Sequence, residues 1–297
     1  MSRSVNSPKA IAAAALLSGS GAAYFMVSPY LVGTAIDSLQ LSERQAGLIP
    51  STYFFGYLLV CLTAVFWMRR FHWQFVALFG YALLISGLFG AAATDNFELL
   101  LVTTFIAGMG GGTLFGLPMC IISDSDNPDR GFGLKIVAEQ AIGVVLLLGL
   151  PIYVTHTWGF KGINVVLGLV LILLAMATFW VPARGVRADD AGGYNAIAGN
   201  GVYVGIGLLA LMLFFGGLSG LYAFVERLAT ERGFDAVSIG QSLALGTIGG
   251  GVGGFAVAVI GDRYGRSRPV AISALVLLCV IAIYATQFSK LTFAAAT

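Results

Sequence analysis

The sequence predicts an all-α protein, a polytopic bundle of transmembrane helices, and two observations carry this prediction. Hydrophobic residues make up 58% of the 297 residues and charged residues only 10%, whereas a soluble domain carries about 25% charged residues. The apolar residues also gather in runs of about 20 residues, the length that a helix needs to cross a bilayer. These runs are longer than membrane strands and do not alternate, so they indicate helices rather than a β-barrel.

The same composition excludes several classes of protein. So few charges cannot cover the exterior of a soluble enzyme, and the apolar content is too high for a disordered chain. The formal net charge of +2 is too small to indicate a polyanionic partner such as a nucleic acid. We therefore expect the lipid bilayer to be the main partner of this chain.

Nine apolar runs are long enough to span a membrane, and each is bounded by a polar segment. The first three runs are followed by LSER, RRFHW and TDNFE. The later boundaries are SDSDNPDRG, HTWGFKG, the long segment 183–200, ERLATERGFDA and GDRYGRSRP. The predicted spans are 10–34, 46–68, 73–93, 98–122, 133–155, 162–182, 201–225, 237–260 and 269–288.

Lysines and arginines in the polar segments predict the orientation of the spans. With the N-terminus in the cytoplasm, 11 of the 16 basic residues fall in inner segments and the other five in outer ones, as the positive-inside rule requires. The first run is similar to a secretory signal, but its apolar sequence continues through 23–32 and eight runs follow, so we interpret it as a span. We expect an integral protein of a bacterial inner membrane.

The polar segment 183–200 divides the chain. It predicts an N-terminal half of six helices at 1–182, a cytoplasmic linker at 183–200 and a C-terminal part with three helices at 201–297. Six helices, a linker and three helices look like an architecture of two halves whose second half is three helices short. A truncated, non-transporting fragment is therefore one of the readings that the sequence leaves open.

The loop after the eighth predicted span carries the most specific motif, AVIGDRYGRSR at 258–268. It resembles the G-x-x-x-D-R-x-G-R signature of the major facilitator superfamily, although an alanine replaces the first glycine and a serine interrupts the basic run. The residues that carry the likeness are Asp262, Arg263, Gly265, Arg266 and Arg268. An ordinary basic cytoplasmic loop is the alternative reading.

This resemblance implies a function and a gating role for the motif. It implies a secondary transporter that moves a small solute by alternating access, with H⁺ as the expected coupling ion. The motif would then latch the cytoplasmic side through charge pairs. The equivalent loop of the first half keeps Arg69 and Arg70 but lacks the glycine and the aspartate, so the resemblance does not extend to a latch there.

Two ladders of glycines at intervals of four residues stand in the fourth and eighth spans. Small residues at this spacing form a smooth stripe against which another helix packs closely. The stripes are either plain packing surfaces or surfaces that slide during alternating access. The ladder residues are Gly108, Gly112 and Gly116 in one span and Gly246, Gly250 and Gly254 in the other.

Charged residues within spans are functional candidates, because a bilayer penalises them. Glu139, with Gln140 beside it, lies inside the fifth span, and Lys135 four residues earlier offers it an ion pair. Glu139 is therefore either neutralised by that pair or part of proton coupling. Asp37, Glu226 and Arg227 lie at the outer ends of spans, where they are either solvated at the interface or in contact with substrate.

The sequence gives little support to an enzyme. His72 and His156 are predicted on opposite sides of the membrane, and the aspartates at 124, 126 and 129 are better explained by a proline turn and helix caps. No phosphate loop of the G-x-x-x-x-G-K-[ST] type is present, and we expect neither a cofactor nor a metal. The solute, the transport direction and the oligomeric state are not specified by the sequence.

Overall fold

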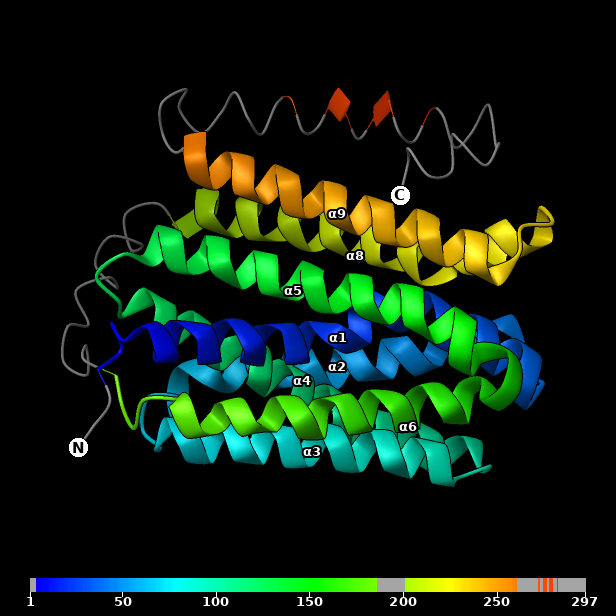
Figure 1. The fold of residues 1–297 in the computed structure, drawn as a ribbon, viewed down its shortest axis with the longest axis horizontal. Coiled ribbons are helices and arrows are strands. Elements are labelled where there is room, and N and C mark those ends of the chain that lie inside the picture. Colours follow the sequence, from blue (N-terminus) through cyan, green and yellow to red (C-terminus); the bar gives the residue numbers. More distant parts are fainter. Residues whose placement is uncertain are drawn as a thin grey trace.

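The computed structural model describes residues 4–185 and 201–260, together with single helical residues between 272 and 282. Every element in these ranges is a helix, which confirms the predicted all-α bundle (Figure 1). Six helical stretches of the described residues are long and apolar enough to cross a membrane. Most of the predicted span 269–288 lies outside the described residues.

The α-helices agree closely with the predicted spans through residue 260. Two short helices of other types lie between them, a π-helical turn at Pro151–Thr155 and a 3-10 turn at Met176–Trp180. The α-helices are α1 (Pro8–Leu39), α2 (Glu43–Trp67), α3 (Trp73–Ala93), α4 (Phe97–Ser123), α5 (Pro128–Leu150), α6 (His156–Ala175), α8 (Gly201–Glu231) and α9 (Ala236–Ile260).

Polar side chains cap the starts of five of these helices. The residues Ser7, Ser42, Asn96, Asn127 and Asp235 each accept a hydrogen bond from the backbone amide three residues later. These bonds satisfy amides that have no partner within the helix. At the start of α2 the Gln45 side chain also accepts from the Ser42 amide, which completes a capping box.

The reversal between α5 and α6 differs from the prediction. The polar segment 156–161 was expected to be a loop, but helix α6 begins at His156. The helical hydrogen bonding is disturbed at Pro151, which has no amide hydrogen to donate, and the π-helical turn begins there. The change of direction is then concentrated at Gly159, whose φ of 53° and ψ of −144° are not helical.

Helix α1 occupies the centre of the bundle and packs against α4, α5, α6 and α8 (Figure 1). Leu17, Tyr24, Val27 and Leu31 are buried along its length. Helix α4 packs between α2 and α3, and α9 packs against α5. Large apolar side chains such as Phe55 and Phe66 on α2 are exposed on the exterior, as a lipid environment favours.

The structure does not test the predicted division of the chain. Helices α8 and α9 contact the first six helices mainly through α1 and α5, respectively. Most of the segment 183–200 lies outside the described residues. The halves at 1–182 and 201–297 therefore stay a prediction.

Candidate functional site

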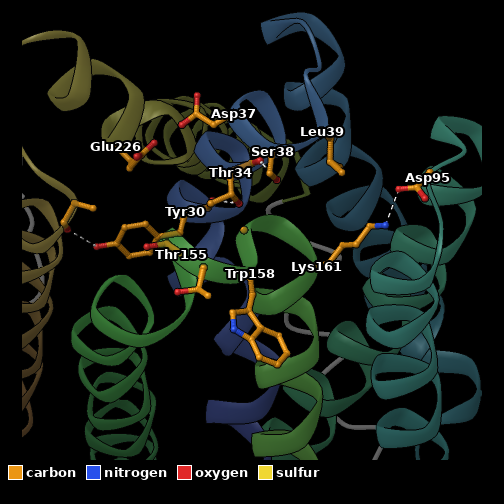
Figure 2. A pocket seen from close by; sticks show the side chains of 13 residues that line it. Tyr30, Thr34, Asp37, Ser38, Leu39, Asp95, Thr155, Trp158, Lys161 and Glu226 are labelled. Atoms are coloured by element: carbon orange, nitrogen blue, oxygen red, sulfur yellow. Dashed lines mark hydrogen bonds and ion pairs between the residues drawn. The ribbon is translucent and has the colours of Figure 1, made fainter.

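A cavity of about 570 Å³ lies at the end of the bundle opposite to the N-terminus (Figure 2). Its wall is formed by the last turns of α1, the start of α6, the turn before α4, and residues from α8 and α9. Helices from both sides of the segment 186–200 therefore contribute to one cavity. Its size is within the range of pockets that hold small molecules.

Three ion pairs neutralise most of the charges around this cavity. Lys161 Nζ lies 2.6 Å from Asp95 Oδ1 on one side of the cavity (Figure 2). Arg227 Nη1 lies 3.6 Å from Asp37 Oδ1, and Arg227 Nε lies 3.2 Å from Glu231 Oε1. Two of the residues predicted for coupling or substrate, Asp37 and Arg227, therefore form an ion pair with each other.

Glu226, the third of these outer residues, is placed differently. It lines the cavity and has no ion pair among the described residues. Its Oε1 accepts a hydrogen bond from Thr230 Oγ1 at 3.2 Å, whereas Oε2 is buried and has no hydrogen-bond partner in the described part of the chain. The carboxylate lies over Gly33 of α1, where any added side chain would overlap it.

Backbone geometry at the reversal positions the aromatic wall of the cavity. The Phe160 amide donates a hydrogen bond to Ser38 Oγ at 3.2 Å, and Ser38 Oγ donates to the Thr34 carbonyl at 2.5 Å. These bonds hold the start of α6 against the end of α1. They place Trp158, 67% exposed, in the cavity wall below Thr34 (Figure 2).

A second group of charges is buried inside the bundle. Lys135 Nζ lies 2.6 Å from Glu139 Oε1, and their side chains are only 6% and 11% exposed. The Ser18 hydroxyl of α1 also donates to Glu139, and the Lys135 ammonium lies 4.3 Å from the centre of the Phe115 ring. The ion pair that the four-residue spacing offered is therefore formed, and it joins α5 to α1 and α4.

Gln140 is separated from this group and faces another helix. An added Cβ at Gly250 of α9 would lie 3.4 Å from Gln140 Nε2, and one at Gly251 would lie 3.5 Å from Gln140 Cβ. Both distances are ordinary van der Waals contacts. The structure therefore places Gln140 at the contact between α5 and α9, away from the outer cavity.

Stacked aromatic rings join α1 to α2 and α8. The rings of Tyr24 and Tyr53 stack with centroids 3.7 Å apart, and those of Phe25 and Tyr222 with centroids 5.1 Å apart. The Tyr222 hydroxyl donates to the Met26 carbonyl at 2.9 Å. These contacts fix Tyr222 of α8 against the central helix.

The two glycine ladders pack differently. An added Cβ at Gly108 would overlap the Tyr53 backbone, and one at Gly112 would lie 2.7 Å from the Tyr57 carbonyl oxygen, whereas Gly116 faces the end of the Met68 side chain. The first ladder is therefore a tight contact between α4 and α2. The second ladder, Gly246, Gly250 and Gly254, lies on α9, where the contact at Gly250 is looser.

An ion pair at the end of the bundle near the N-terminus was not expected. Arg69, in the turn after α2, forms two hydrogen bonds with Asp124 at the end of α4. The bonds to this carboxylate raise the pKa of the Arg69 guanidinium above its ordinary value. The loop between α2 and α3 therefore forms an ion pair with the end of α4, which the resemblance of its sequence to the family motif did not indicate.

The residues of the cytoplasmic motif, Asp262, Arg263, Gly265, Arg266 and Arg268, lie outside the described residues. Their latch function stays a prediction. Among the residues that are described, no three histidine, cysteine, aspartate or glutamate side chains are grouped as metal ligands.

Sequence reasoning missed several residues of these sites. Lys161, Asp95 and Trp158 stand in polar segments that were read only as boundaries between spans. Asp124 was read as part of a turn. Each has a charge or an aromatic ring beside the membrane, but only the packing of the helices brings Asp124 to Arg69 and Asp95 to Lys161.

Comparisons with known proteins identify one family and one related fold. The sequence model of the Major Facilitator Superfamily matches residues 13–296. No curated protein matches the sequence. The crystal structure of a D-xylose-proton symporter has a similar fold, with a TM-score of 0.64 and 12% sequence identity, over 97% of this chain and 78% of the symporter.

Proposed function

Because this chain belongs to the Major Facilitator Superfamily, we propose that it moves a small solute across the membrane by alternating access and uses a proton gradient. The observation that carries the proposal is the cavity of about 570 Å³ walled by α1 and α6 together with residues of α8 and α9. A cavity between two groups of helices is opened or closed when one group rocks against the other.

The contact between α5 and α9 supports such a movement. At Gly250 and Gly251 an added Cβ would meet Gln140 at ordinary van der Waals distance, whereas at Gly240 it would lie 2.6 Å from the Leu147 carbonyl oxygen of α5. The looser contact at Gly250 leaves room for this part of α9 to move against α5. Rocking at this contact would change access to the cavity.

The orientation follows from the distribution of basic residues. With 11 of the 16 lysines and arginines in inner segments, the N-terminus is cytoplasmic and the cavity opens to the outside. The membrane in this proposal is a bacterial inner membrane. The pair of Arg69 and Asp124 then lies on the cytoplasmic side.

Two carboxylates are the candidates for proton coupling. Glu139 is bound to Lys135 and Ser18, so a proton on Glu139 would break a buried ion pair. Glu226 lines the cavity and has no ion pair among the described residues, so a proton there would remove an uncompensated charge. Either change alters the electrostatic energy of the helices around the cavity.

The test uses the full-length chain in proteoliposomes that contain a pH-sensitive dye. A panel of small solutes is added outside, and both the uptake of each solute and the proton flux that it induces are measured for wild type, Glu139→Gln and Glu226→Gln. We expect at least one variant to transport without moving protons. Glu98→Gln is the control, since Glu98 is exposed in the first turn of α4 and does not line the cavity. Wild-type proton flux in both variants would contradict the coupling proposal, and no solute flux at all would contradict transport.

A further inference from the structure

The charges of the outer cavity do not balance. Three carboxylates line it, those of Asp37, Asp95 and Glu226, against one ammonium group, that of Lys161. Lys161 is paired with Asp95, and Arg227 stands beside Asp37. Among the described residues this leaves Glu226 as the carboxylate of the cavity wall that forms no ion pair.

Three hydroxyl groups of the cavity, those of Thr34, Ser38 and Thr155, present acceptors rather than donors. Thr34 donates its hydroxyl proton to the Tyr30 carbonyl, Ser38 to the Thr34 carbonyl and Thr155 to the Pro151 carbonyl, at 2.6, 2.5 and 3.2 Å. Their oxygens therefore add partial negative charge to a wall that is already acidic.

Aromatic rings complete the wall. Trp158 and Tyr30 both line the cavity, and Figure 2 shows the Trp158 indole beneath Thr34 with Glu226 and Asp37 on the same side as Tyr30. The faces of aromatic rings carry negative charge and attract cations, and indole does so most strongly. Because Tyr30 is only 1% exposed, the exposed Trp158 indole is the aromatic surface that the cavity offers to the apolar groups of a cation.

From these three observations we infer that the outer cavity binds a small organic cation, a quaternary or protonated amine, with Glu226 as its counter-ion and Trp158 as its aromatic wall. A bare metal ion fits less well. Divalent ions need several oxygen ligands converging at about 2–2.6 Å, and no such group of acidic side chains exists among the described residues. A cavity of about 570 Å³ instead has room for a molecule with several carbon atoms.

This inference deepens the proposed function, and it is tested by binding rather than by transport. The full-length chain in lipid nanodiscs is titrated calorimetrically with choline and with 3,3-dimethylbutan-1-ol, which has nearly the same shape but no charge. We expect choline to bind saturably and at least tenfold more tightly than the neutral analogue. Equal affinities, or no binding of choline at millimolar concentrations, would overturn the inference.

Variants then locate the site. Glu226→Gln keeps the shape of the side chain and should weaken choline binding at least tenfold, while binding of the neutral analogue stays unchanged. Glu98→Gln, at the same end of the bundle, removes one carboxylate outside the cavity and should bind choline as wild type does. Choline affinity that is unchanged in Glu226→Gln would place the cation elsewhere and overturn the inference.

A third variant guards against a folding defect in Glu226→Gln. Trp158→Leu keeps every charge and removes the indole, so it should weaken choline binding several-fold; an unchanged affinity would contradict the aromatic wall. The outcomes also separate the two proposals. Choline binding without any solute flux would support the cation site and contradict the transport function. Flux of another solute without choline binding would support the transport function and contradict the cation site.

Discussion

Arg69 and Asp124 form a two-point ion pair, with Arg69 Nη2 2.8 Å from Asp124 Oδ1 and Nη1 3.0 Å from Oδ2. The pair joins the turn after α2 to the end of α4. The two side chains differ in exposure, because Asp124 is 1% exposed and Arg69 40%. The carboxylate is the partner that depends on the pair, since water can solvate the guanidinium but not the buried aspartate.

This asymmetry predicts unequal effects of removing either partner. Arg69→Ala leaves a buried carboxylate without its cation and should lower the stability by about 3 kcal/mol. Asp124→Asn leaves an arginine that water solvates and should cost about 1 kcal/mol. Thermal unfolding in detergent measures both, and Arg70→Ala in the same turn, where the side chain is exposed, is the control. Equal losses in the two variants would contradict this account.

The buried pair of Lys135 and Glu139 predicts a rescue. Lys135→Met leaves Glu139 with the Ser18 hydroxyl but no cation, and a buried charge without its partner is costly. The double variant Lys135→Met, Glu139→Gln has no charge left to compensate and should be more stable than Lys135→Met alone, by about 2 kcal/mol or more. The melting temperatures of Lys135→Met, Glu139→Gln and the double variant test this expected rescue. A double variant less stable than Lys135→Met would mean that the pair does not act as a unit.

The glycine ladders predict a contrast between two alanine substitutions. Gly108→Ala places a methyl group against the Tyr53 backbone, which cannot move aside without separating α2 from α4. Overpacking of this kind costs about 1–3 kcal/mol. Gly250→Ala meets only the Gln140 side chain at 3.4 Å and should be tolerated. Detergent melts of the two variants compare them directly, and a Gly250→Ala variant as unstable as Gly108→Ala would refute the looser packing of α9.

The reversal at Gly159 predicts sensitivity to any side chain. Its φ of 53° and ψ of −144° are costly for other residues, and an added Cβ would lie 2.8 Å from Ser38 Cβ. Gly159→Ala should lower the stability by about 1–3 kcal/mol and disturb the cavity wall at Trp158. Gly149→Ala in α5 is the matched control, since no atom of the residues that the structure describes lies within 4 Å of its added Cβ. A change in tryptophan fluorescence reports a disturbed cavity wall, and the melting temperature reports the stability. If Gly159→Ala and Gly149→Ala give the same values, the backbone at Gly159 is not strained by a side chain.

The sequence was sufficient for features that depend on nearby residues. The spans follow from apolar runs set against the length of a helix in a bilayer. The pair of Lys135 and Glu139 follows from a spacing of four residues on one helix, because such residues are neighbours on its surface.

Features that depend on the packing of separate helices were not predictable from the pattern. Arg69 and Asp124 are 55 residues apart in sequence. The pattern of residues in a single sequence does not indicate which helix ends lie next to each other in the bundle. The cavity has the same origin, because it combines residues from α1, α6, α8 and α9. The reversal at 156–161 was misread because its polar residues indicate a loop, whereas Gly159 alone makes the change of direction within a helical segment.

The buried pair of Lys135 and Glu139 also has a consequence for the membrane potential. As an ion pair it carries no net charge, so moving it relative to the bilayer does little electrical work. A proton added to Glu139 would leave the Lys135 ammonium as a net positive charge, and moving one charge through the full potential is worth about 2.3 kcal/mol per 100 mV. Protonation at this position would therefore make the movement of the surrounding helices respond to voltage.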